Sequence, residues 1–174
     1  MSDSAKTITR RGFAAASAAA LVGFASPPHA AAQDAGDTLR SEFLVDLVFD
    51  VATPLNLGTR QIVPVTGGTF NGPKLKGTAL SGGGDWIQRR PDGVSMLNVR
   101  ATLRTDDEQL IYITYDGILY VPAGAGASAA DRYWRMTPKF ETGSAKYEWL
   151  TRIVSVGVGR QVPGKAAYRV FQIL

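Results

Sequence analysis

A carboxylate follows a run of three glycines in the segment Ser81-Gly82-Gly83-Gly84-Asp85-Trp86. Glycine enters positive-φ conformations and lets another backbone or a ligand approach closely, so a carboxyl group beside an indole at such a bend suits a small-molecule site. Asp85 is therefore a candidate general acid or base. Glu141 is the second candidate, and two carboxylates brought together act as acid and base when their environments separate their pKa values. The structural alternative is that backbone N–H groups bind Asp85 and that a neighbouring arginine pairs with Glu141.

Five further side chains belong to the same hypothesis. Tyr115 is a candidate general acid, and the guanidinium of Arg100 suits carboxylate or enolate oxygens. Trp86, Tyr147 and Trp149 are candidates for stacking on a ring-bearing ligand, although aromatic side chains in a barrel more often serve packing.

The residue types that are missing exclude several chemistries. The chain has no cysteine, and its one histidine is His29, near the N-terminus. A Ser-His-Asp triad, a cysteine nucleophile and a typical zinc site are therefore excluded, and we expect no metal. We also expect no cofactor, because no lysine and hydroxyl pair follows the glycine run as in a phosphate loop, and no redox cofactor fingerprint is present. Asp106-Asp107-Glu108 is interpreted as a solvated hairpin turn rather than a Ca²⁺ loop.

The N-terminal segment has the composition of an export signal. A pair of arginines, Arg10 and Arg11, precedes a short alanine-rich apolar run that ends near the small residues 30–32. This pattern predicts a twin-arginine (Tat) signal peptide over residues 1–32, a linker over 33–40 and one domain over 41–174. We expect a periplasmic or secreted protein with no membrane attachment after cleavage, because the apolar run is too short to span a bilayer.

The net charge gives no support for nucleic-acid binding. The whole chain has 19 basic and 15 acidic residues, but the predicted signal holds Lys6, Arg10, Arg11 and Asp3, which leaves 16 against 14. The remaining basic residues form no stripe of the kind that phosphate backbones need. A small molecule is the expected partner.

The predicted domain has the periodicity of strands. Apolar residues alternate along 43–51 and 94–104, and turn residues recur about every ten positions, which predicts an all-β fold. About ten strands in one domain favour a closed antiparallel β-barrel, since closure removes exposed edges. Further strands are expected at 59–65, 74–81, 85–90, 109–121, 132–141, 147–161 and 166–174, with a low-complexity loop over 122–130.

The strand around Arg100 has two clean faces, and the sequence leaves open which one is internal. Leu97, Val99, Ala101 and Leu103 lie on one face, and Asn98, Arg100, Thr102 and Arg104 lie on the other. If the polar face lines the lumen, Arg100 meets a ligand; if the apolar face is internal, Arg100 is solvated.

Several ordered motifs resemble a family of uncharacterised bacterial and fungal proteins, catalogued as domain-of-unknown-function family 3237. They are Pro64-Val65-Thr66-Gly67-Gly68-Thr69-Phe70-Asn71-Gly72-Pro73, Leu75-Lys76-Gly77, Gly82-Gly83-Gly84-Asp85-Trp86, Leu97-Asn98-Val99-Arg100, Thr105-Asp106-Asp107, Tyr115-Asp116-Gly117, Phe140-Glu141-Thr142-Gly143-Ser144 and Tyr147-Glu148-Trp149-Leu150. The resemblance spans nearly all of residues 41–174 and implies a compact antiparallel β-barrel of lipocalin-like proportions, but no activity. Thr151 departs from the asparagine expected after the Trp-Leu pair.

Two functional hypotheses follow. The first is a binding protein that holds a small aromatic or hydrophobic molecule in a barrel pocket. The second is a cofactor-independent acid–base enzyme, a lyase, isomerase, dehydratase or cyclase, with Asp85 or Glu141 as base, Tyr115 as acid and Arg100 as oxyanion stabiliser.

Overall fold

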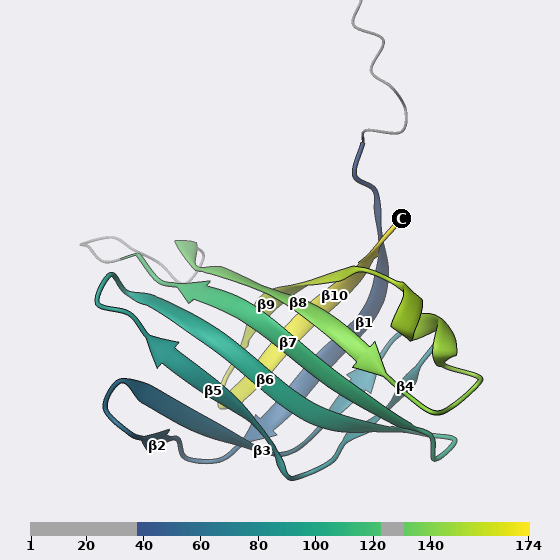
Figure 1. The fold of residues 1–174 in the computed structure, drawn as a ribbon, viewed down its shortest axis with the longest axis horizontal. Helices are drawn as coiled ribbons and strands as arrows, with labels where there is room; N and C mark the ends of the chain where they lie inside the picture. Colours follow the sequence, from purple (N-terminus) through teal and green to yellow (C-terminus); the bar gives the residue numbers. More distant parts are fainter. Residues whose placement is uncertain (1–37, 123–130) are drawn as a thin grey trace, which may run out of the picture. The chain divides into compact units, whose positions relative to one another are not determined.

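The computed structural model describes residues 38–122 and 131–174. The predicted signal peptide and residues 123–130 of the predicted loop lie outside these ranges. The described chain forms ten strands and one 3-10 helix (Figure 1). They are β1 (Ser41–Val51), β2 (Leu55–Asn56), β3 (Arg60–Asn71), β4 (Lys76–Ala79), β5 (Gly83–Arg89), β6 (Val94–Thr105), β7 (Leu110–Tyr120), β8 (Tyr133–Glu141), the 3-10 helix (Glu148–Arg152), β9 (Ser155–Val162) and β10 (Lys165–Ile173).

The sheet closes on itself, because β1 pairs with β10 on one side and with β3 on the other. The hydrogen-bonded order is β1-β10-β9-β8-β7-β6-β4-β3, and all pairings are antiparallel; β5 also lies between β3 and β6, and β2 pairs with β3. The ring thus has eight members. The predicted all-β class and the closed antiparallel barrel are confirmed.

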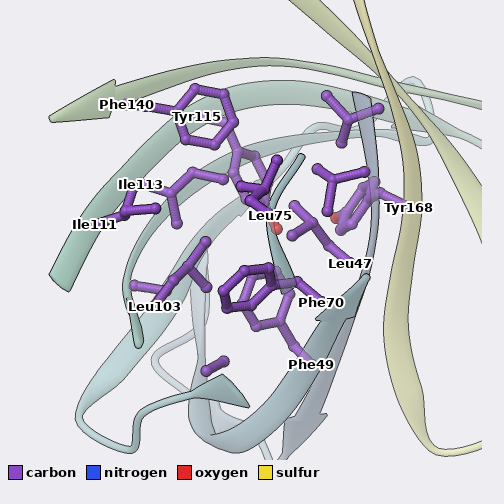
Figure 2. Close-up of a cluster of buried hydrophobic side chains, with 14 of the residues drawn as sticks. Leu47, Phe49, Phe70, Leu75, Leu103, Ile111, Ile113, Tyr115, Phe140 and Tyr168 are labelled. Atoms are coloured by element: carbon purple, nitrogen blue, oxygen red, sulfur yellow. The ribbon is translucent and has the colours of Figure 1, made fainter. Parts of the chain in front are cut away.

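Apolar side chains fill the interior at one end of the barrel. Figure 2 shows the side chains of this core, and Leu103, Ile111 and Ile113 among them have no exposed surface. Because side chains alternate between faces along a strand, the core position of Leu103 places Leu97, Val99 and Ala101 inside as well. The apolar face of β6 is therefore the internal one, and Arg100 lies on the outer surface.

A structured cap closes this end of the barrel. Leu150 of the 3-10 helix is 1% exposed and packs into the core. The Tyr147 hydroxyl donates to Asp107 Oδ1 at 2.9 Å, and Thr142 Oγ1 donates to the Leu110 carbonyl at 2.6 Å, which ties the β8–β9 connection to the β6–β7 turn. We call residues 142–152 with the turn at 106–109 the cap.

Three local predictions need correction. Residues 147–161 do not form one strand, because the chain turns into the 3-10 helix to bury Leu150 before β9 begins at Ser155. The second predicted strand does not stop at Val65: β3 passes through a bulge next to that residue and continues to Asn71 along β1 and β4. A further irregularity between Phe43 and Val45 turns Phe43 to the outer surface, where its ring contacts Arg169.

Within residues 38–122 and 131–174, no helix is long and apolar enough to cross a bilayer.

Candidate functional site

Asp85 faces the interior of the barrel. It lies opposite Val99 in the β5–β6 ladder, and Val99 lies opposite Tyr115 in the β6–β7 ladder. Paired residues of an antiparallel ladder share a face, so all three side chains point inward, as the 1% exposure of Val99 and 3% exposure of Tyr115 require. The glycine run before Asp85 makes the turn into β5, with Gly82 at φ 101°.

Tyr115, Tyr168 and Trp134 lie together on this interior surface. The rings of Tyr115 and Tyr168 meet edge to face with centroids 5.3 Å apart, and Trp134 meets Tyr168 in the same way at 5.0 Å. We call Asp85, Tyr115, Tyr168 and Trp134 the inner polar cluster. It comes from four strands, β5, β7, β10 and β8, that are far apart in sequence.

Several inward side chains beyond this cluster, at the end opposite the cap, are only partly buried. Val63 and Gln61 share the inward face with Asp85 and Ile87 through the β3–β5 ladder. These side chains and Trp134 are all partly exposed, whereas the inward side chains near the cap are fully buried. The barrel interior is therefore less completely covered at the end that holds the polar groups.

The surroundings of Asp85 favour its neutral form. Burial raises the pKa of this carboxyl group from 3.8 to about 6, although the Asn98 backbone N–H that donates to Oδ1 at 3.0 Å acts in the opposite direction. Among the described residues, the other carboxylate oxygen accepts no hydrogen bond. A carboxyl group that changes charge near neutral pH is suited to proton transfer.

The two tyrosines stay protonated around Asp85. Burial raises the pKa of Tyr115 well above 10.0, and interactions with Tyr168 and with the Asp85 carboxylate raise it further. Burial also raises the pKa of Tyr168, while its contacts with Tyr115 and Trp134 oppose that rise. Both phenols are therefore neutral hydrogen-bond donors at physiological pH.

Arg100 and Trp86 form a separate group on the outer surface. The guanidinium lies 5.3 Å from the centre of the Trp86 ring, and its Nη1 donates to Asn98 Oδ1 at 2.9 Å. Asn98 Nδ2 in turn donates to Asp116 Oδ1 at 2.7 Å. The structure does not bring Arg100 to Asp85 or Tyr115, because the sheet lies between them.

Glu141, Tyr147 and Trp149 lie at the cap. Glu141 is exposed at the end of β8 on the outer face, so the structure does not bring the two candidate carboxylates together. Tyr147 is 4% exposed and hydrogen-bonded to Asp107, and Trp149 packs against the core with Lys74 Nζ 5.5 Å from its ring centre. These contacts give both aromatic residues a structural role in the cap. Thr151 closes a turn of the 3-10 helix on the Glu148 carbonyl.

The sequence interpretation missed Trp134 and Tyr168. Each lies in an alternating strand, next to Met136 and Val170, and the alternation alone indicates an ordinary core face. The sequence signal that could have indicated them is the glycine at position 159. Gly159 pairs with Tyr168 and leaves room for the Trp134 ring, because a Cβ atom there would lie 2.1 Å from Trp134 Cδ2.

No metal-binding group is evident in the described part of the chain, where no three His, Cys, Asp or Glu side chains are arranged to hold an ion. The Asp106-Asp107-Glu108 turn is held instead by lysines: Lys76 pairs with Asp106 at 3.1 Å, and Lys146 pairs with Asp107 at 2.7 Å.

Comparison with known families identifies the chain. The model of the family described as "Protein of unknown function (DUF3237)" matches residues 39–173, the whole barrel. The chain belongs to this family. It is 33% identical over 125 residues to a UPF0311 protein of Clostridium acetobutylicum, covering 67% of this chain and 79% of that protein. A UPF0311 protein of Rhodopseudomonas palustris is 29% identical over 131 residues, covering 71% and 86%.

Solved structures share the DUF3237 barrel. A β-barrel-like protein of Acinetobacter baumannii superposes with a TM-score of 0.73 at 32% identity, covering 79% of this chain and 97% of that one. A protein of unknown function from C. acetobutylicum has the same TM-score at 30% identity, covering 79% and 98%. An enzyme from Penicillium herquei reaches 0.62 at 21% identity, covering 78% and 95%, a likeness of fold alone.

Proposed function

We propose that the interior of this DUF3237 barrel binds a small aromatic or hydrophobic molecule at the inner polar cluster. The observation that carries the proposal is Asp85, an inward carboxyl group with one oxygen left without a hydrogen bond among the described residues. A partly buried carboxylate oxygen without a protein donor is open to a ligand that donates a hydrogen bond.

The neighbours of Asp85 support an aromatic ligand. The rings of Tyr115, Tyr168 and Trp134 present apolar surface beside hydroxyl groups, which is the usual composition of a small-molecule site. The binding role given to Trp86, Tyr147, Trp149 and Arg100 is not part of this proposal, because their contacts lie on the outer surface or in the cap.

A second candidate function is cofactor-independent acid–base catalysis, and the pKa of Asp85 near 6 favours it. In this mechanism ionised Asp85 removes a proton from the bound molecule, and neutral Tyr115 or Tyr168 donates a hydrogen bond to the oxygen that gains charge. Glu141 has no part in it, since it lies outside the barrel.

Native mass spectrometry of the protein purified from its own host tests the binding proposal. We expect a co-purified organic molecule on the wild type and its loss from the Asp85→Leu variant, while the exposed control Glu141→Gln retains it. A molecule that Asp85→Leu retains at full occupancy would contradict the proposed site. The identified molecule then serves as the substrate in turnover assays, where Asp85→Asn separates binding from catalysis.

We also propose export through the twin-arginine pathway, on the residue pattern of Arg10 and Arg11. Cell fractionation tests it with the double variant Arg10→Lys/Arg11→Lys. We expect the wild type in the periplasm or medium and the variant in the cytoplasm. Equal distribution of the two proteins would overturn the export proposal and leave the barrel site untouched.

A further inference from the structure

Two arginines lie at the end of the barrel opposite the cap. Arg89 is two residues beyond Ile87 and four beyond Asp85 on the same face of β5, and it pairs across the ladder with buried Ser95. Arg132 lies two residues before Trp134, and its guanidinium is 6.0 Å from the centre of the Trp134 ring. Because residues two apart on a strand share a face, Arg89 stands on the same face of β5 as Asp85. Arg132 lies just before β8 and is placed next to that face by its contact with the Trp134 ring. We call them the rim arginines.

The N–H groups of the rim arginines lack acceptors or a compensating charge in the contacts described here. Arg132 Nε is buried and has no hydrogen-bond partner among the described residues. Arg89 Nη2 donates to Gln61 Oε1 at 2.8 Å, a neutral acceptor that leaves the positive charge uncompensated by that contact. Native structures rarely leave buried N–H groups without an acceptor, so these arginine N–H groups are candidates to bind an acceptor group of a ligand.

The two ends of the site differ in charge. Four residues of strand separate Arg89 from Asp85, a span of about 13 Å along β5. Positive donors therefore lie at the rim, whereas Asp85, Tyr115 and Tyr168 lie deeper. A molecule that fits both ends has an acceptor group with negative charge at one end and a ring with a neutral polar group at the other.

We propose that the ligand is an aromatic anion, with its carboxylate or sulfonate group bound by Arg89 and Arg132, and its ring directed toward the inner polar cluster. This inference rests on the proposed function and specifies the ligand class. Arginine suits the task, because its planar set of N–H groups binds two oxygens of one anionic group.

A pair of fluorescent probes with the same ring system tests the ligand class. 8-Anilinonaphthalene-1-sulfonate has the anionic group, and N-phenyl-1-naphthylamine lacks it. We expect the sulfonate probe to bind at least ~10-fold more tightly to the wild type, with an affinity that falls as salt is added. Arg89→Gln and Arg132→Gln should each weaken the sulfonate probe by ~10-fold and change the neutral probe by less than about 2-fold.

The matched control is Arg104→Gln, which removes a positive charge from the outer face of β6. It should leave the affinity for both probes unchanged. Thermal unfolding followed by circular dichroism checks that each variant is folded. If Arg132→Gln does not fold, the variant Arg89→Gln at the exposed position decides the test.

The outcomes separate the two proposals. Equal affinity of the two probes, or a sulfonate affinity that neither rim variant lowers, overturns the aromatic-anion inference while binding in the barrel stands. Binding of neither probe to the wild type counts against both. Loss of sulfonate binding in Arg104→Gln to the same extent as in Arg89→Gln would also overturn the inference, because it would indicate general charge attraction.

Discussion

At the residue scale, Asp85 is held where the fold disfavours its charge. The folded-state pKa of about 6 lies above the value of 3.8 for the free group, so the folded protein binds a proton there more tightly than the unfolded chain does. Ionisation of Asp85 therefore lowers stability as the pH rises through about 4 to 6, and the full cost is present above that range. A residue that is kept at such a cost is a functional candidate on physical grounds.

The variant Asp85→Asn should be more stable than the wild type at pH 7.5, because the amide keeps the shape and an oxygen for the Asn98 N–H without the charge. A rise in pKa from 3.8 to about 6 corresponds to an upper limit of about 3 kcal/mol, and we expect a gain of ~1–3 kcal/mol in the free energy of unfolding. Urea titrations between pH 3.5 and 8 measure it. The gain should vanish below pH 4, and a pH-independent difference would show that the charge is not its cause.

Exposed Glu141 provides the control for that series. Glu141→Gln should change the free energy of unfolding by less than ~0.5 kcal/mol across the same range, as surface substitutions usually do.

At the scale of the strands, β8, β9 and β10 are fitted together by one aromatic side chain. Trp134 of β8 lies over Gly159 of β9, and its ring packs against Tyr168 of β10. Any side chain at Gly159 displaces that ring and with it one wall of the inner polar cluster.

Gly159→Ala should therefore lower the free energy of unfolding by ~1–3 kcal/mol, since the added methyl group overlaps the indole and the core cannot expand without strain. Tryptophan fluorescence and near-ultraviolet circular dichroism should change as Trp134 moves. Gly143→Ala is the matched control, because no atom lies within 4 Å of the position that its added Cβ atom would take. Equal stability of the two variants would contradict the packing described.

The strands were largely predictable from the sequence, and the site was predictable only in part. The alternation of apolar and polar residues along 94–104 identified a strand with one apolar face, because successive side chains of a strand point to opposite faces. Asp85 and Tyr115 were among the candidates, and the structure places both inside. Arg100 and Glu141 were also candidates, but which face meets the lumen depends on pairing with strands far along the chain. Trp134 and Tyr168 become neighbours only through that pairing.

At the scale of the whole barrel, the ring of hydrogen bonds has one weak junction. The β6–β7 ladder is paired from Val94 to Arg104, whereas the β8–β9 ladder is paired only at Arg135 with Val158 and Met136 with Gly157. Toward the cap a side-chain hydrogen bond joins the two strands instead, from Ser155 Oγ to the Pro138 carbonyl at 3.0 Å.

We expect the barrel to open first at the β8–β9 junction. Amide hydrogen exchange measured by NMR should show lower protection for the amides of β8 and β9 that face this junction than for the amides shared by β6 and β7. Uniform protection around the ring would mean that the cap and core, rather than the ladder, determine local stability.

The first and last strands of the barrel also meet, since Ser41 lies opposite Ile173 and the Leu174 N–H donates to the Arg40 carbonyl at 2.9 Å. A short peptide linker joining these two ends would give a circular permutant, with new termini cut at the exposed turn around Asp92 and Gly93. Affinity tags or fluorescent labels attached at residues 40 and 174 would sit beside the cap, at the far end from the rim arginines. Immobilisation through residue 40 or residue 174 would thus leave the end of the barrel opposite the cap free for ligand screening on a sensor surface.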